Sequence, residues 1–345
     1  MARGATDNPY VRTADDSTFE DSLRPGSFGD FVGQRKTVAN LQVAIKAARK
    51  RREALDHVLM SGLPGLGKTT LARIIAMEMK SNFHVTSGPI LKRPGDLAGM
   101  LTKLEEGDVL FIDEIHRILP DVEEYLYTAM EDFFISINVD TGPSGRTINL
   151  PLRKFTLIGA TTREGLLSEP FRARFGILEK LEFYPADDLV TILKRSGGIL
   201  RMEIEPDAAR LLASRARGTP RIANRFLRRV RDLAQVKNHP RIEPPTALEA
   251  LKMLGVDEAG LDDMDRKILQ TLVNHAGGPL GLKTISVSVG EQEDTIEEVY
   301  EPYLIQQDFL LRTSRGRRAT EKAYKHLGVA IDSRGTATSP QRQLF

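Results

Sequence analysis

The spacing of apolar and polar residues changes character twice along this chain of 345 residues. Up to about Tyr184, short apolar runs alternate with amphipathic stretches of helical period. The three runs that most resemble strands are 57–60, 109–112 and 155–158. Short β-rich runs separated by amphipathic helices are typical of a parallel sheet covered by helices. The pattern therefore predicts an α/β domain over residues 21–184.

Residues 134–152 interrupt this alternation. Ile135, Ile137 and Val139 alternate with polar residues, a Gly-Pro turn follows at 141–145, and a second alternating run returns. Two alternating runs joined by a turn rich in glycine and proline predict a β-hairpin. We expect this hairpin to protrude from the domain.

The pattern from 185 onward is helical. Residues 185–256 contain no convincing strand and predict a small helical domain, and 257–260 has the character of a linker. Residues 257–330 predict three helices followed by a basic hairpin, which is the layout of a winged-helix domain. We expect 1–20 to be a flexible segment and the polar tail 331–345 to be disordered.

Composition excludes several classes of protein. Without cysteine, disulfides and cysteine-ligated zinc are impossible. The start of the chain lacks the apolar core of a signal peptide, and we see no apolar run near the roughly 20 residues that span a bilayer. We therefore expect a cytoplasmic protein. The net charge is only +2, but basic clusters occur at 46–52, 215–231 and 312–326. A solvated surface explains the first cluster equally well.

The clearest chemical motif is the segment 62–69, Gly-Leu-Pro-Gly-Leu-Gly-Lys-Thr. It matches G-x-x-x-x-G-K-[ST] in full, between a predicted strand and a predicted helix. Glycines let backbone N–H groups approach phosphates, and the following helix start adds a positive dipole. In such a loop Lys68 reaches the β- and γ-phosphates and the Thr69 hydroxyl binds Mg²⁺. The motif predicts a site for ATP and Mg²⁺.

Further polar residues follow the predicted strands. Asp113 and Glu114 end the run at 109–112, where Asp113 would orient Mg²⁺ and Glu114 would polarise the attacking water. Thr161 follows the next run and could touch the γ-phosphate, although turn chemistry alone also explains it. Arg174 could act as a finger on a neighbour's ATP, with a surface salt bridge as the alternative. Arg221 could fold over the nucleotide, while the other arginines of its helix could pair with acids or face DNA.

Taken together, the order of these motifs resembles the AAA+ ATPases, over about residues 20–328. The resemblance is specific to the bacterial members that drive branch migration at Holliday junctions. It implies an AAA+ P-loop domain, a small helical lid domain and a C-terminal winged-helix domain. It also implies a homohexameric ring on double-stranded DNA. The hairpin at 134–152 would dock a junction-binding partner protein, and a junction resolvase would cooperate with the ring.

The resemblance assigns roles to matching positions in this chain. Nucleotide contacts are implied for Leu23, Arg24, Gly65, Lys68, Thr69, Thr70, Glu131, Asp132, Phe133, Thr161, Arg174, Tyr184 and Arg221. Catalysis is implied for Lys68, Asp113, Glu114 and, from the neighbouring subunit, Arg174. DNA contacts are implied for Arg312 and Arg317. Two positions depart from the family's usual residues: Leu63 replaces a proline in the loop, and Ala173 replaces an aspartate beside Arg174.

Two other functions share parts of this pattern. A clamp loader or replication-initiation ATPase has most of the ATP motifs but no reason for this winged helix. A winged-helix transcription regulator with an ATP-sensing domain would bind specific bases and turn over slowly. A GTPase is disfavoured because the guanine-reading Asn-Lys-x-Asp motif does not occur in the sequence.

Overall fold

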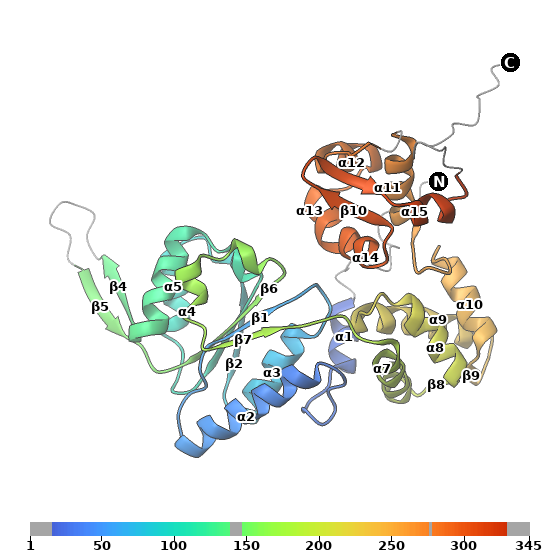
Figure 1. Ribbon diagram of the computed structural model, residues 1–345. Helices are drawn as coiled ribbons and strands as arrows, with labels where there is room; N and C mark the ends of the chain where they lie inside the picture. Colours follow the sequence, from blue (N-terminus) through green and yellow to red (C-terminus); the bar gives the residue numbers. More distant parts are fainter. Residues whose placement is uncertain (1–15, 139–146, 276–277, 330–345) are drawn as a thin grey trace. The chain divides into compact units, whose positions relative to one another are not determined.

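The computed structural model describes residues 16–138, 147–275 and 278–329. These residues form two compact units (Figure 1). One unit spans Asp21–Tyr184, and the other contains the chain from Pro185 onward together with the residues up to Glu20. The short helix α1 (Asp16–Leu23) begins in one unit and ends in the other. The expectations for the turn at 141–145 and the tail 331–345 fall outside the described residues, as does most of the segment 1–20.

The Asp21–Tyr184 unit is built on a five-stranded parallel sheet in the order β2-β3-β6-β1-β7, which confirms the predicted α/β fold. The strands are β1 (Val58–Ser61), β2 (Phe83–Ser87), β3 (Val109–Asp113), β6 (Thr156–Thr161) and β7 (Ile177–Lys180). The three predicted strands are the central ones. Strands β2 and β7 were not predicted; they lie at the two edges of the sheet and carry less apolar sequence.

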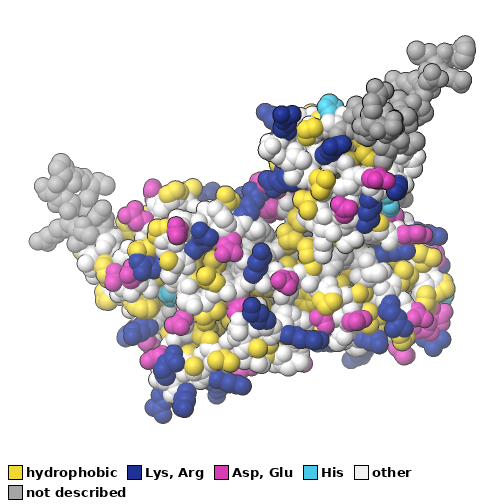
Figure 2. All heavy atoms as spheres, in the orientation of Figure 1, with side chains coloured by type: hydrophobic (Ala, Val, Ile, Leu, Met, Phe, Trp, Pro, Cys, Tyr) yellow, Lys and Arg dark blue, Asp and Glu magenta, His cyan; other side chains and the backbone are white. Residues whose placement is uncertain are grey.

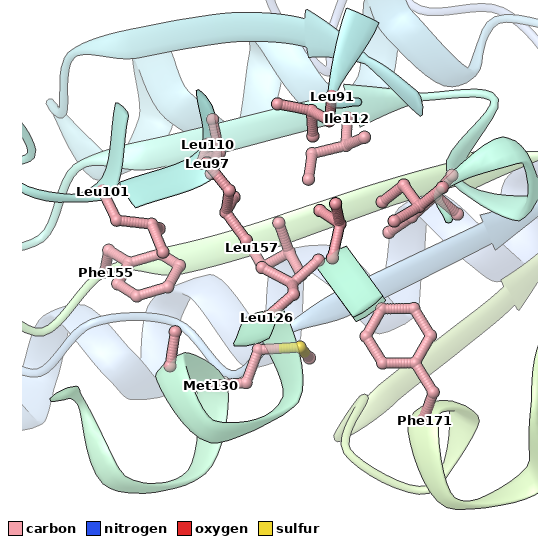
Figure 3. Close-up of a cluster of buried hydrophobic side chains, with 14 of the residues drawn as sticks. Leu91, Leu97, Leu101, Leu110, Ile112, Leu126, Met130, Phe155, Leu157 and Phe171 are labelled. Atoms are coloured by element: carbon pink, nitrogen blue, oxygen red, sulfur yellow. The ribbon is translucent and has the colours of Figure 1, made fainter. Parts of the chain in front are cut away.

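Helices cover both faces of this sheet (Figure 1). They are α2 (Arg35–Arg51), α3 (Lys68–Met79), α4 (Pro94–Leu101), α5 (Pro120–Asp132) and α6 (Glu169–Arg172), with 3₁₀ turns η2 (Gly88–Ile90), η3 (Ile115–Arg117) and η4 (Glu164–Leu166). Figure 3 shows the core between α4, α5 and one sheet face, where Leu110 and Ile112 pack with Leu97 and Leu126. Because side chains alternate along a strand, every second residue of β3 faces this core.

The hairpin predicted at 134–152 is present as β4 (Phe134–Asn138) and β5 (Thr147–Pro151), paired antiparallel with Ile137 opposite Ile148. It follows α5 directly and extends away from the sheet (Figure 1). Its base is tied to the domain by Ile135, which is buried in the same core as α4 and α5. Ile148, by contrast, is exposed.

The lid that begins at Pro185 is mainly helical, as predicted. Its helices are α7 (Ala186–Ile199), α8 (Pro206–Arg215), α9 (Pro220–Val236) and α10 (Pro244–Met253). It also contains a two-residue parallel pair, β8 (Glu203–Ile204) with β9 (Arg241–Ile242), where the sequence analysis expected no strand. Runs of two residues are too short to produce a recognisable alternation.

The winged-helix domain follows. It contains α11 (Asp263–Asn274), α12 (Leu282–Val289), α13 (Glu293–Thr295), a π-helical turn η5 (Ile296–Tyr300), α14 (Glu301–Gln306), β10 (Leu310–Thr313), β11 (Gly316–Ala319) and α15 (Glu321–His326). The wing is the antiparallel pair β10–β11, with Arg312 opposite Arg317. The domain has its own core, in which Tyr300 and Phe309 are fully buried.

The stretch at 257–260, expected to be a linker, is a hydrogen-bonded turn. The Asp257 carboxylate accepts hydrogen bonds from the N–H groups of Ala259 and Leu261, both at 2.9 Å. Arg266 donates to Gly255 O at 2.8 Å and to Leu261 O at 2.9 Å. Across the part of the chain that the structure describes, we find no helix with both the length and the apolar character needed to cross a bilayer.

Candidate active site

The phosphate-binding loop joins β1 to α3 and therefore lies at the carboxyl edge of the sheet. All three of its glycines have left-handed backbone, with φ of 142° at Gly62, 80° at Gly65 and 106° at Gly67. Other residues are strained there, and a Cβ at Gly62 would also come within 2.8 Å of Leu181 O. Glycine is thus required. A loop of this kind leading into a helix N-terminus is suited to bind phosphate through backbone N–H groups.

Lys68 begins α3 directly after the loop, and the residue is 8% exposed. Its Nζ donates hydrogen bonds to Gly62 O at 2.5 Å and to Leu63 O at 2.9 Å. The ammonium is therefore held over the loop itself. Thr69 and Thr70 follow in the first turn of α3, whose N-terminal end is also the positive end of its dipole.

Asp113 ends β3 and Glu114 follows it, so both reach the same edge of the sheet as the loop. The N–H of Glu114 donates to Asp113 Oδ1 at 3.0 Å, which orients that carboxylate. Glu114 has φ of 48°, a conformation uncommon outside glycine, and its carboxylate pairs with Arg117 at 3.0 Å. The two acids thus occupy different surroundings: one is fixed by backbone and the other is held at the surface.

Thr161 ends β6, between the strands that carry the loop and the acids. Its Oγ1 accepts a hydrogen bond from the N–H of Arg163 at 2.9 Å and lies 3.1 Å from His116 Nδ1, to which it can donate its own proton. Burial lowers the pKa of His116, partly opposed by Glu114 and reinforced by Arg163. The ring is therefore neutral at pH 7 and shares a hydrogen bond with the Thr161 hydroxyl, so His116 has a hydrogen-bonding role.

Two aromatic side chains pack against the end of the loop. The Tyr184 hydroxyl donates to Leu66 O at 3.1 Å. The ring of Phe31 lies beside Gly67, 3.2 Å from where a Cβ would stand. Phe31 was not predicted as a site residue, because one aromatic residue in a glycine-rich segment carries no motif.

Leu23 and Arg24 precede the segment that carries Phe31. Leu23 is 3% exposed, so it is part of the core rather than a solvated side chain. Arg24 pairs through Nε with Asp21 at 2.8 Å. Leu23 is therefore buried, whereas Arg24 has an acidic neighbour in Asp21.

A second polar cluster lies at the opposite edge of the sheet. Arg174 pairs with Glu131 at 2.8 Å, lies over the ring of Tyr127 with 4.4 Å to the centroid, and donates to the Tyr127 hydroxyl. Arg174 precedes β7, whose first residue, Ile177, is in register with Val58 at the start of β1. The cluster therefore sits where the strands begin, whereas the loop sits where they end.

Phe133 lies at this same edge. It ends α5 with φ of 52°, and its ring centroid is 6.3 Å from that of His57 and 5.9 Å from that of Phe155, which precede β1 and β6. The four residues of β1 span about 13 Å at roughly 3.3 Å each. Glu131, Asp132 and Phe133 are thus separated from the phosphate loop of their own chain.

Arg221 belongs to the other unit, in the first turn of α9. Its Nε lies 3.3 Å from Glu20 Oε1, and Arg225 Nε lies 3.9 Å from the same oxygen. Thr219 is the N-cap of this helix and Pro220 its first residue. The arginine-rich cluster at 215–231 is therefore partly neutralised by an acid from α1.

The wing arginines differ from one another in their surroundings. Arg312 is exposed and pairs with Glu297 at 2.7 Å. Arg317 is 8% exposed, with its Nε 2.6 Å from Glu301 Oε1 and a second nitrogen 3.4 Å from Glu297. Strand alternation turns Arg318 outward instead, and Arg315 at the turn is also exposed. Arg317 therefore anchors the wing to the domain in this structure, while its neighbours face solvent.

Figure 2 shows basic side chains on the visible face of the winged-helix domain, interspersed with acidic ones. Such a surface suits contacts with a phosphate backbone at several separate points. Among the described residues, we find no cluster of three or more His, Cys, Asp and Glu side chains arranged to hold a metal ion.

Comparison with known proteins covers nearly all of the described chain. A family model described as the Holliday junction DNA helicase RuvB P-loop domain matches residues 23–181. Models of the RuvB AAA lid domain and of the RuvB C-terminal winged-helix domain match 184–257 and 258–328. These matches correspond in order to the P-loop unit, the lid and the winged helix described above.

Individual relatives agree. The Holliday junction branch migration complex subunit RuvB of Kosmotoga olearia is 59% identical over 310 residues, covering 90% of this chain and 91% of that protein. The subunit of the same name from Flavobacterium johnsoniae gives the same values. The solved structure of the Thermotoga maritima RuvB Holliday junction branch migration motor is 51% identical with a TM-score of 0.83, covering 90% of this chain and 99% of that one.

Proposed function

The chain belongs to the RuvB family of Holliday junction DNA helicases, and we propose that it forms a hexameric ring on double-stranded DNA. In this proposal ATP hydrolysis drives branch migration at Holliday junctions, in recombination and DNA repair. The observation that carries it is the pairing, in one chain, of a complete phosphate-binding loop with a winged-helix domain whose wing exposes arginines. We place the protein in the cytoplasm, where its substrate is.

The phosphate end of ATP would bind at the carboxyl edge of the sheet. Gly65 and the neighbouring loop N–H groups would contact the phosphates, and Lys68 would exchange its carbonyl partners for phosphate oxygens. Thr70 would add a contact from the first turn of α3. These groups come from one rigid strand–loop–helix unit, so they are positioned before the nucleotide arrives.

The residues at this edge also fit Mg²⁺. The Thr69 hydroxyl and the Asp113 carboxylate are oxygen donors, which this ion prefers, and it commonly binds few protein ligands together with substrate phosphates. Asp113 would act through a bound water. When present, the ion would offset phosphate charge. Glu114 would then orient and deprotonate the attacking water, for which it must leave its surface pair with Arg117.

We assign Arg174 to the nucleotide of the neighbouring subunit. Because Arg174 and the loop occupy opposite edges of one sheet, a single chain cannot bring both to one phosphate. In a ring, the starting edge of one sheet would face the loop of the next. Glu131, Asp132 and Phe133 would then line the neighbour's pocket together with Arg174 and support its developing charge.

The remaining contacts would report which nucleotide is bound. Leu23 and Arg24 would lie on the adenine side, and Tyr184 would close the end of the loop, where it already contacts Leu66 O. Thr161 would sense the γ-phosphate through its hydroxyl. Arg221 would exchange Glu20 for the nucleotide and carry the lid with it.

The wing would contact DNA phosphates without reading the bases. Arg312 is exposed and suited to this, and Arg315 at the turn and Arg318 on the other face of the wing are exposed as well. For Arg317 we propose a revised role. Because it is buried against Glu301 and Glu297, it would hold the wing in place rather than contact the phosphates itself.

The hairpin 134–152 would dock the junction-binding protein RuvA. Its described part presents Ile148 to solvent, which suits an apolar contact at a protein interface. RuvC, the junction resolvase, would cooperate with the same assembly.

The experiment that tests this function is dissociation of a synthetic four-way junction by the purified protein with ATP and Mg²⁺, with and without RuvA. We expect ATP-dependent dissociation that Lys68→Ala abolishes. ATP hydrolysis without any junction dissociation, with RuvA present, would contradict the proposed function. Binding that depends on base sequence would point instead to a regulator.

A further inference from the structure

One lid side chain, Arg217, is buried in the winged-helix domain. Arg217 is 3% exposed and its guanidinium pairs with Asp265, which is 0% exposed. Its Nε also donates to Gly260 O at 3.0 Å, and the guanidinium lies over the Tyr303 ring, 4.8 Å from the centroid. We call Arg217, Gly260, Asp265 and Tyr303 the domain joint. Its partners come from the turn before α11, from α11 and from α14.

The acceptor side of the joint is itself fixed. Asp265 and Asp262 form a reciprocal capping box at the start of α11, with both N–H to carboxylate distances at 2.8 Å. The Tyr303 hydroxyl donates to Ala259 O at 2.7 Å. A guanidinium that meets a fixed carboxylate, a fixed carbonyl and a fixed ring has little freedom to change direction.

The backbone conformation at Arg217 is an uncommon one for a residue with a side chain. Its φ is 54°, in the left-handed region that residues other than glycine adopt at a cost. Arg201, in the same lid, has the same φ of 54° but is exposed. Asn238, also in the lid and exposed, has φ of 56°. Of these three described lid residues, only Arg217 directs its side chain into the next domain.

The joint is close in sequence to the nucleotide-facing arginine of the lid. Arg217 and Arg221 are separated by Gly218, Thr219 and Pro220, and the Thr219 hydroxyl donates to Arg217 O at 3.1 Å. Thr219 is the N-cap of α9, whose first turn holds Arg221. A displacement of this helix start therefore moves both arginines together.

From these contacts we infer that Arg217 is a positioning residue that makes the lid and the winged-helix domain move as one body. Displacement of Arg221 by the nucleotide is thereby transmitted to the wing. The hydrogen-bonded turn at 257–260 and the Arg266 contacts limit bending of the chain that connects the lid to the winged-helix domain. The domain joint then fixes the orientation of one domain relative to the other. This inference rests on the proposed function, since it names the element that couples ATP hydrolysis to DNA movement.

The test combines Arg217→Gly with Asp265→Asn. Glycine suits φ of 54°, and removing both charges avoids leaving one buried without a partner. Arg201→Gly is the matched control, because it makes the same change at the same φ on the lid surface. The chain has no cysteine, so Lys252→Cys on α10 and Lys283→Cys on α12 allow two specific spin labels.

Three quantities are measured for each protein: the distribution of label distances, the ATPase rate on DNA, and the junction dissociated per ATP hydrolysed. For the combined variant we expect a broadened distribution, ATPase within about threefold of wild type, and about tenfold less junction dissociated per ATP, a typical size for a lost coupling. Arg201→Gly should match wild type in all three. A narrow distribution with unchanged coupling would overturn the inference.

Two further outcomes are informative. If the combined variant does not fold, Arg217→Lys is used in its place. It keeps the buried charge but loses the Nε contact and the stacking on Tyr303. An unchanged amount of junction dissociated per ATP in this variant would also refute the inference. If wild type itself does not dissociate junctions, the proposed function fails. The label distances then still report whether the joint is rigid.

Discussion

The guanidinium of Arg174 lies 2.8 Å from the carboxylate of Glu131, at the edge of the sheet opposite the phosphate loop. The residue before Arg174 is Ala173, so the acidic neighbour of Arg174 comes from α5 instead of from the adjacent residue. The ring of Tyr127 supports the same guanidinium. An arginine held in this way is oriented in advance, which favours the transition-state contacts of its proposed role.

Weakening the contact between Glu131 and Arg174 should slow ATP hydrolysis without affecting ATP binding. In Glu131→Gln we expect kcat to fall by roughly three- to tenfold and the ATP dissociation constant to stay unchanged, because a charge-assisted contact that orients Arg174 is lost. Arg174→Ala should lower kcat by about 10³-fold. Steady-state ATPase with DNA and equilibrium ATP binding measure the two quantities. Glu124→Gln, on the exposed face of the same helix, should behave as wild type; an unaffected kcat in Glu131→Gln would show that the pair has no catalytic role.

The wing arginines should separate into two classes. Arg312→Ala should reduce the slope of log affinity against log salt by about one, because one phosphate contact is lost. Arg317→Ala should instead lower stability by about 3–5 kcal/mol, because Glu301 is left buried without its partner. Duplex binding across a salt series and thermal unfolding make the distinction. Lys325→Ala, at an exposed position of α15, serves as the control. A large loss of salt slope in Arg317→Ala with normal stability would restore it as a direct DNA contact.

His57 should make stability depend on pH. Its Nδ1 accepts the N–H of Leu157 at 2.8 Å, so Nε2 carries the proton and donates to Met130 O at 3.2 Å. Burial lowers the pKa of His57 below its ordinary value of about 6.5. The folded state then binds fewer protons than the unfolded state, so this contribution is complete above about pH 6.5 and is lost as pH falls below it.

We therefore expect the melting temperature to fall between about pH 7 and pH 5. His57→Gln should show a shallower fall, from a lower starting value, since the titrating group is gone but the packing is altered. His275→Gln, at an exposed position, should keep the wild-type profile. If His57→Gln loses as much stability with acid as wild type does, then His57 is not the responsible group.

Leu63 should tune the loop rather than control it. Its contribution to the described site is a backbone carbonyl that accepts from Lys68 at 2.9 Å, and proline retains that carbonyl. We expect Leu63→Pro to change the ATP dissociation constant by less than about tenfold, or 1.4 kcal/mol. Calorimetric titration measures it, with Lys68→Ala as the variant that loses binding. A larger change would mean that the leucine side chain or its N–H shapes the pocket.

The strands that could be predicted from the sequence are those buried in the same way on both faces. β1, β3 and β6 are buried on both faces, so each reads as a continuous apolar run, and the glycine-rich loop follows directly from its motif. β2 and β7 were missed because edge strands need fewer apolar residues. The sequence also could not show that Arg317 points inward while Arg318 points outward. The face on which each arginine of a basic cluster lies is known only once the strand register is known.

Contacts between residues far apart in the sequence also could not be predicted. Residues 257–260 look like a linker because they are polar and contain glycine, and their rigidity depends on Arg266 and Arg217, which the pattern does not connect to them. The separation of Arg174 from the loop likewise can be recognised only from the strand order. β7 pairs with β1, although β7 is the last of the five strands of this sheet in sequence. Motifs identified the chemical groups, and topology decided which of them can act together in one chain.

The sharing of each ATP site between subunits is tested most directly by mixing two inactive proteins. Lys68→Ala removes the phosphate contact and Arg174→Ala removes the finger, and each alone should hydrolyse ATP at about 10⁻³ of the wild-type rate or less. In mixed rings some interfaces combine an intact loop with an intact Arg174 from the other variant. We predict that ATPase activity on DNA recovers to a substantial fraction of wild type, peaking near equal amounts. If every mixture stays as inactive as its components although mixed rings form, Arg174 serves its own chain and the account is wrong.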